Sequence, residues 1–183
     1  MIRERVRMFV ALCACCIFVV RTNVMLYPVV TYHEALGHEG YVNVSIIDIG
    51  EHITNRTYLL HFESLREIRD MKTFFSYSIR AFDGAVQQML LSRWIDGCEF
   101  LRRPNSFRLL KMFYDAVKNN SKIPLCPYRP GYVMALNITP SNFPIPAFIP
   151  ETDFLVEVKV YTRARTLLII ETRWYGSLLR MEN

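Results

Sequence analysis

The chain lacks the patterns that mark the common enzyme classes. It has only seven glycines among 183 residues, and none of them builds a glycine-rich phosphate loop. It has no Gly-x-Ser-x-Gly turn that would present a nucleophile. All four histidines lie in the first third of the chain. We therefore predict that the protein is not an enzyme, has no catalytic residues and needs no cofactor.

A zinc site is equally poorly supported. His33-Glu-Ala-Leu-Gly-His38 imitates a zinc-protease motif but contains one residue too many. Side chains five residues apart on a helix diverge by about 140°, so the two imidazoles cannot face one ion from a helix. The sequence therefore predicts no metal site.

A basic stripe is also missing. The whole chain has 22 Lys and Arg against 17 Asp and Glu, but residues 1–22 hold four of the arginines and one of the glutamates. The remainder has 18 basic and 16 acidic residues, a net charge of about +2. Because nucleic-acid binding needs clustered cations to neutralise phosphates, we expect no nucleic-acid partner.

Long apolar runs are absent except at the N-terminus. Three arginines among residues 3–7 precede the uncharged run from Met8 to Val20, and Arg21-Thr22 ends it. A run of 13 residues is short for a membrane span, which needs about 20, so residues 1–22 are typical of a cleaved signal peptide. An uncleaved signal anchor is the alternative. We expect a secreted, extracellular protein without a stable membrane span.

The cysteines fit that compartment. Three of the five lie inside the apolar leader, and only Cys98 and Cys126 remain after its removal. An even pair in an oxidising compartment predicts a disulfide. It would close a loop of about 29 residues, which stabilises the folded state by about 3.5 kcal/mol on the chain-entropy treatment.

Residues 23–183 are predicted to form a single domain, since they show no repeat and no linker. Apolar residues alternate with polar ones in several short segments, as in 154–161, 168–174, 75–80 and 132–138. Period-two alternation indicates half-buried strands, and several such strands indicate a sandwich or barrel. The fold class is therefore predicted to be all-β.

Four Asn-x-Ser/Thr sequons support the secreted setting and test the strands. They are predicted glycosylation sites at Asn43, Asn55, Asn119 and Asn137. Three of these asparagines fall opposite the apolar face of a predicted strand. A glycan cannot enter a core, so the two inferences agree.

One segment departs from the alternation. Residues 104–120 carry apolar side chains at three- and four-residue spacing, including Phe107, Leu110 and Phe113, which indicates an amphipathic helix. Pro104 suits its first turn. The helix lies inside the loop between the two cysteines, so the disulfide would hold it against the sheets.

Several motifs resemble a known family. The pattern begins with Trp94-Ile-Asp-Gly-Cys-Glu-Phe100-Leu and continues, after the helix, with Cys126-Pro-Tyr128. Phe143-Pro-Ile-Pro146 and Trp174 follow, and Asn55-Arg-Thr57 precedes them. This arrangement resembles the insect secreted domain-of-unknown-function family 1091. A second cysteine pair, common near the start of that domain in the family, is absent between Met25 and Gly97.

The resemblance implies a fold and a type of ligand. The family is thought to be related to the lipid-recognition superfamily, which includes ganglioside activators and some insect chemosensory proteins. This implies an immunoglobulin-like β-sandwich of two sheets that can hold an acyl chain between them.

Composition supports an apolar site. The chain is 51% hydrophobic and 13% aromatic, and small-molecule sites are predominantly apolar. The alternative is that the same residues fill a packed core. The residues expected to line a ligand site are Phe75, Tyr77, Leu90, Trp94, Phe113, Tyr132, Phe154, Val156 and Trp174.

Two functions remain from the sequence. The first is a non-catalytic carrier of a lipid, fatty acid or hydrocarbon pheromone, bound by desolvation between the sheets. The second is a ligand-free extracellular module that engages a receptor or matrix partner. A continuous internal void would favour the first, and a filled interior with exposed loop aromatics the second.

Overall fold

The computed structural model describes residues 24–52, 55–80, 87–145, 149–162 and 165–182. The predicted signal peptide, residues 1–22, lies outside the described residues. Two antiparallel sheets contain the strands β1 (Val24–Gly37), β2 (Val42–Ile49), β3 (Thr57–Ser64), β4 (Met71–Arg80), β5 (Gln87–Asp96), β6 (Val133–Ile138), β7 (Asp153–Thr162) and β8 (Leu168–Glu182).

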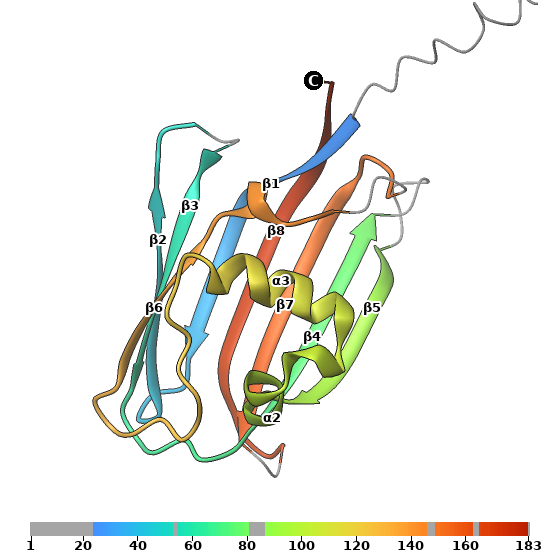
Figure 1. Ribbon diagram of the computed structural model, residues 1–183. Coiled ribbons are helices and arrows are strands. Elements are labelled where there is room, and N and C mark those ends of the chain that lie inside the picture. The colour runs from blue at the N-terminus through green and yellow to red at the C-terminus, as the bar shows by residue number, and fades with distance from the viewer. Residues whose placement is uncertain (1–23, 53–54, 81–86, 146–148, 163–164, 183) are drawn as a thin grey trace, which may run out of the picture.

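The two sheets differ in width (Figure 1). One has five strands in the order β1-β8-β7-β4-β5, and the other has three in the order β2-β3-β6. The predicted all-β, two-sheet β-sandwich is therefore confirmed. The helical elements are α2 (Gly97–Arg102), the 3₁₀ turn η2 (Pro104–Ser106), α3 (Arg108–Lys118) and the 3₁₀ turn η3 (Pro140–Asn142).

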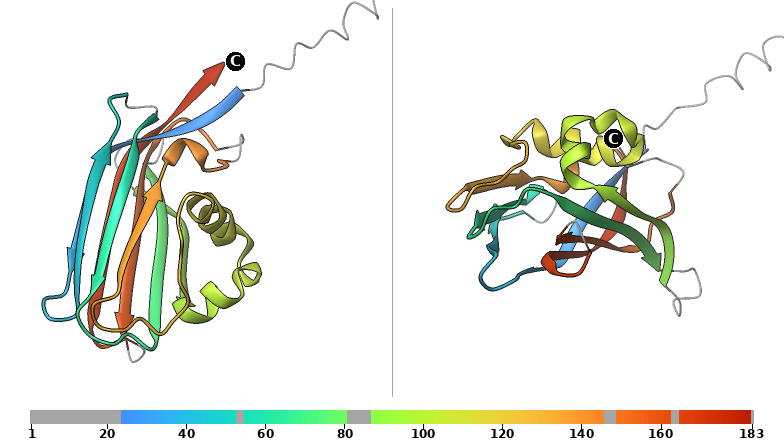
Figure 2. Two further views of the ribbon diagram at one scale, coloured as in Figure 1. Left: turned by 60° about the vertical axis from the view of Figure 1, so that its left-hand side comes forward. Right: turned by 90° about the horizontal axis from the view of Figure 1, so that it is seen from below.

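The helices cover the part of the wide sheet that the narrow sheet leaves open. Seen from below, the wide sheet, the narrow sheet and the helices surround the interior from three sides (Figure 2). Within the described residues, no helix is long and apolar enough to cross a membrane.

Strand alternation places the expected side chains inside. In the wide sheet Phe75 of β4 lies opposite Val158 of β7, which lies opposite Thr172 of β8. Opposite residues of antiparallel strands share a face, so this row faces the interior. The next row, Ser76, Glu157 and Arg173, faces outward.

The helical region differs from the single predicted helix. Asp96 caps α2, since its Oδ1 accepts a hydrogen bond of 2.9 Å from the backbone N–H of Glu99. Pro104 begins the turn η2 rather than the long helix, and Phe107 is extended between η2 and α3. The predicted amphipathic helix therefore starts later, at Arg108, and a second helix precedes it.

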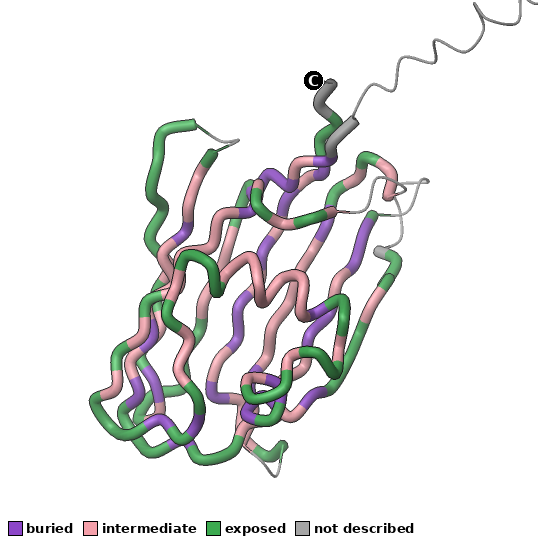
Figure 3. Tube along the Cα trace, in the orientation of Figure 1, coloured by how far each residue is buried: buried purple, intermediate pink, exposed green. Residues whose placement is uncertain are grey.

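Helix α3 packs on the wide sheet through aromatic and aliphatic side chains. The ring of Phe113 lies 5.9 Å from that of Phe75 on β4. Beneath the helix, a core cluster unites Phe75, Ile95, Phe100 and Leu110. The residues Lys111–Val117 are nevertheless only half-buried (Figure 3).

The predicted disulfide is present. Cys98 in α2 and Cys126 are both buried, and their sulfurs are bonded across a separation of 28 residues. The Cys126–Pro127 peptide bond is cis. The bond joins the two ends of the segment that contains α3, as the sequence predicted.

We expect the double substitution Cys98→Ser and Cys126→Ser to lower the free energy of unfolding by about 3.5 kcal/mol, because the unfolded chain regains the freedom of the 29-residue loop. Denaturant unfolding followed by circular dichroism measures the difference. An unchanged midpoint would show that contacts other than the disulfide hold the helical segment.

Gly176 permits a close approach inside the wide sheet. It lies on β8 between Val30 of β1 and Phe154 of β7. A Cβ built there would clash with the carbonyl oxygen of Val29 and would lie 2.6 Å from Cζ of Phe154. This carbonyl belongs to the backbone of β1, which is paired with β8, so it cannot move away without disturbing the hydrogen bonds between the two strands.

Gly176→Ala should therefore destabilise the protein by about 3 kcal/mol or more, the upper end for overpacking. Gly40→Ala is the matched control, since nothing lies within 4 Å of its Cβ position and only its φ of 77° opposes the change. We expect the control to cost about 1 kcal/mol. Thermal unfolding of both variants measures the loss of stability in each. Equal losses would contradict the close packing at Gly176.

Candidate functional site

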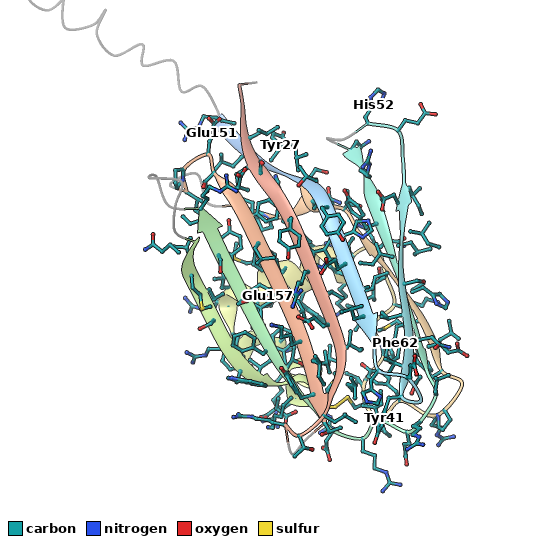
Figure 4. All side chains as sticks on the ribbon, turned by 180° about the vertical axis from the view of Figure 1, so that it is seen from behind. Tyr27, Tyr41, His52, Phe62, Glu151 and Glu157 are labelled. Carbon is teal, nitrogen blue, oxygen red and sulfur yellow. A yellow bond between two sulfur atoms is a disulfide. The ribbon has the colours of Figure 1, made fainter. Side chains whose placement is uncertain are left out.

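The buried apolar residues form three clusters, which partly buried residues such as Val156 and Val158 connect. One cluster gathers around the disulfide and includes Phe62 and Tyr128. A second, near the opposite end of the sheets, includes Tyr58, Phe154 and Trp174. The third is the cluster beneath α3. Figure 4 labels Phe62 among the side chains of the first cluster.

Two adjoining cavities border these clusters. The larger has a volume of about 340 Å³ and the smaller about 170 Å³. Their walls share residues from α3, β6 and the wide sheet: Phe75, Phe113, Val117, Ile138, Val158 and Trp174. The larger volume falls within the range of about 300–1,000 Å³ that is usual for small-molecule pockets.

Both cavities are apolar. Among the described residues that line them, none carries a charged side chain. The indole Nε1 of Trp174 donates a hydrogen bond of 3.2 Å to Thr172 Oγ1, and the Tyr128 hydroxyl donates one of 3.3 Å to the carbonyl of Pro124. These two polar groups are thus satisfied, and a cavity with so few polar partners does not favour water.

Two tyrosines that border the cavities, Tyr77 and Tyr128, are protonated at neutral pH. Burial raises the pKa of Tyr128 to about 12, helped by the neighbouring Tyr132. Burial alone raises the pKa of Tyr77 to about 12. Each hydroxyl is therefore an uncharged donor, which leaves the cavities without ionised groups.

Six of the nine residues expected at the ligand site border a cavity. Phe75, Phe113 and Trp174 border both, while Tyr77, Phe154 and Val156 border the smaller one. Strand alternation and helical spacing placed all six on inward faces. Whether any of them contacts a ligand stays a prediction.

The other three lie elsewhere. The register of β4 and β5 shifts between Tyr77 and Ser78, so that Leu90 is an extra residue on β5, and it is 45% exposed. Trp94 pairs with Phe74 on the outer face and is 39% exposed. Tyr132 stacks on Tyr128 within the disulfide cluster and borders neither cavity.

Several wall residues were missed, for two different reasons. Val117 and Val158 share faces with predicted residues, so the same periodicity could have found them. Pro140, Phe143 and Ile145 come from η3 and the irregular segment after it. Irregular backbone has no period, and no sequence signal marks these residues as part of the wall.

The outer face of the wide sheet has a different character. Lys159 lies 3.1 Å from Glu157 and 3.4 Å from Glu171, and Arg173 lies 2.7 Å from Glu171 and 3.4 Å from Glu34. Figure 4 shows this face from behind, with Glu157 labelled on it. The charges are paired with one another across strands, which is typical of a solvent-facing sheet surface. Nothing in this network converges on a reactive group.

The predicted glycosylation sites lie mostly at the surface. Asn43, Asn55 and Asn119 are exposed. Asn137 is half-buried, because the segment after α3 crosses its strand. Its Nδ2 donates to the carbonyl of Asn120 at 2.9 Å. Leu136 and Ile138 line the larger cavity, so Asn137 lies on the opposite face of β6, and its glycosylation stays a prediction.

Metal ligands do not gather anywhere in the described part of the chain: no three His, Cys, Asp or Glu side chains come together. His33 and His38 are not on a helix. His33 is on β1 and bonds to Asp48 Oδ1 at 2.6 Å, while His38 lies in the turn after the strand.

Comparison with known protein families finds a match, which covers part of the chain. Residues 73–156 match the family described as Protein of unknown function (DUF1091). The DUF1091 region runs from β4 to the middle of β7 and contains α2, the disulfide, α3 and β6. It thus supplies much of the cavity wall. The predicted link to the lipid-recognition superfamily and the insect origin stay predictions.

Other comparisons are sparse. No curated protein matches the chain. A solved structure entitled "Crystal structure of the C-terminal domain of wzt" aligns with a TM-score of 0.38 and 11% identity, over 85% of this chain and 81% of that chain.

The outer ionic network generates a pH prediction. Burial by itself would raise the pKa of Glu157, but the hydrogen bonds from Lys159 and Ser76 together with the charges of Lys159 and Arg173 outweigh it and lower the pKa. A lowered carboxyl pKa contributes stability above the ordinary value of 4.5, and that contribution disappears as the pH falls. Glu157→Gln should therefore lose less stability than the wild type between pH 6 and pH 3.

Glu39→Gln, in the exposed turn after β1, is the control. We expect its acid unfolding curve to follow the wild type. Equal acid sensitivity of the Glu157→Gln variant and the wild type would contradict the role of Glu157.

Proposed function

We propose that this protein is a non-catalytic, secreted carrier that binds an apolar small molecule or lipid between its two sheets. The observation that carries the proposal is the pair of adjoining apolar cavities, bordered by both sheets and α3. A filled interior would have favoured the ligand-free interaction module instead. Two adjoining apolar cavities that share part of their wall favour the carrier.

The size of the cavity sets the scale of the ligand. If one methylene occupies about the liquid volume of a water molecule, about 30 Å³, the larger cavity of about 340 Å³ holds on the order of ten carbons. At about 0.8 kcal/mol per buried methylene, ten carbons contribute about 8 kcal/mol before the costs of association. A chain of this length is therefore expected to bind with micromolar or weaker affinity.

The secreted setting rests on the sequence and is supported by the disulfide. Such bonds persist in oxidising compartments and are rare in the cytosol. The leader and the exposed sequons agree with that setting. A carrier of this kind needs no residue to perform chemistry, because desolvation of the ligand supplies the binding energy.

Filling the cavity should abolish binding while leaving the fold intact. Val158→Phe adds a phenyl ring on a residue that borders both cavities. Because it enters a void, it should lower the affinity for a neutral fluorescent probe, N-phenyl-1-naphthylamine, by tenfold or more. A packed core would instead lose about 1–3 kcal/mol of stability through overpacking.

Leu155→Phe, on the outward face of the same strand, is the matched control and should bind the probe like the wild type. Val117→Phe, on α3, repeats the test from the opposite wall. Failure of the wild type to bind the probe, together with a clean apo mass in native mass spectrometry, would refute the carrier and leave the interaction module.

A further inference from the structure

One polar group of the cavity wall has no partner. Tyr77 lies on the inward face of β4, opposite Val156 of β7 and Leu91 of β5. It borders the smaller cavity, and its ring lies 6.3 Å from that of Phe154. Its hydroxyl oxygen is buried, and no described residue offers it a hydrogen bond.

An unpaired buried hydroxyl is unusual. Buried polar side-chain atoms in folded proteins nearly always have a partner, so each exception requires an explanation. Burial raises the pKa of Tyr77 to about 12, which keeps the proton in place at neutral pH. The hydroxyl is therefore an unused, uncharged donor on a side chain that borders the cavity, and it meets a ligand acceptor through a movement of the ring or of its neighbours.

The rest of the wall restricts what that acceptor can be. The indole of Trp174 is already bonded to Thr172, and the described lining residues of both cavities include no Lys, Arg or His. A carboxylate would lose its hydration without meeting a cation, which is costly in an apolar environment. A neutral oxygen loses much less hydration free energy than a carboxylate when it enters such a cavity.

We propose that Tyr77 is the polar anchor of the ligand site, and that the natural ligand is a neutral molecule with an oxygen acceptor, such as a long-chain alcohol, ester or ketone. Its oxygen accepts a hydrogen bond from the Tyr77 hydroxyl beside the smaller cavity, and its hydrocarbon chain extends into the adjoining larger cavity. This inference rests on the proposed carrier function and narrows its ligand class. Among apolar ligands it favours neutral molecules that carry an oxygen over ionised fatty acids and over plain hydrocarbons.

The test compares three ligands of the same chain length, each in the wild type and in one variant. The affinities of 1-decanol, decane and decanoate are measured at pH 7.5 by displacement of N-phenyl-1-naphthylamine from the full chain. Tyr77→Phe removes the hydroxyl and keeps the ring. It should weaken the affinity for 1-decanol by roughly five- to tenfold, the value of one hydrogen bond, and leave that for decane unchanged.

The wild type should also bind decanoate more weakly than 1-decanol. The melting temperature supplies a second readout. Because the Tyr77 hydroxyl has no partner in the free protein, Tyr77→Phe should melt at the same temperature as the wild type or higher. A hydroxyl with a structural role would lower it.

Tyr161→Phe is the matched control. Tyr161 lies on β7, and its ring contacts Trp94, which lies on the outer face of the same sheet. This substitution should change none of the three affinities. Unchanged 1-decanol affinity in Tyr77→Phe, an equal loss for decane, or tighter binding of decanoate than of 1-decanol would each overturn the anchor. Those results leave the carrier function standing, whereas it falls if the wild type binds neither the probe nor any of the three ligands.

Discussion

The unequal width of the two sheets is the constraint on which the rest of the structure depends. Five strands face three, so part of the wide sheet must be covered by something other than a strand. Helices α2 and α3 provide that cover. A helix is thicker than a strand and cannot interdigitate with a sheet over its whole length, which helps explain why α3 stays half-buried and why space remains beneath it.

The disulfide makes this cover part of the fold. Cys98 begins the helical segment and Cys126 ends it, so the bond closes the loop that contains α3. Without such a tether, an eleven-residue helix would have to hold its place through one apolar face. The DUF1091 match spans this tethered helix, the bond and the strands β4, β5 and β6, and it supplies much of the cavity wall, while β1, β2, β3 and β8 supply most of the rest.

Sequence periodicity was sufficient for the regular elements and insufficient for the site. The inward faces of β4, β7 and β8 followed from period-two alternation, and the apolar side of α3 from helical spacing. Leu90 was misplaced because a register shift between β4 and β5 makes it an extra residue, which no local pattern announces, and Trp94 was misplaced because it lies on the outer face of β5. Phe143 and Ile145 were missed because irregular segments reach the wall only through the long-range path of the chain.

The sequence by itself determined which strand faces are apolar, which cysteines pair and that the segment of α3 is helical. These properties follow from the spacing and the type of nearby residues. Only the tertiary structure decided whether the apolar faces meet or leave a void. That outcome depends on how the two sheets, α3 and the segment after η3 pack together, and these elements are distant in the sequence. The missing partner of the Tyr77 hydroxyl is likewise a tertiary result, because the groups around a buried atom come from several such elements.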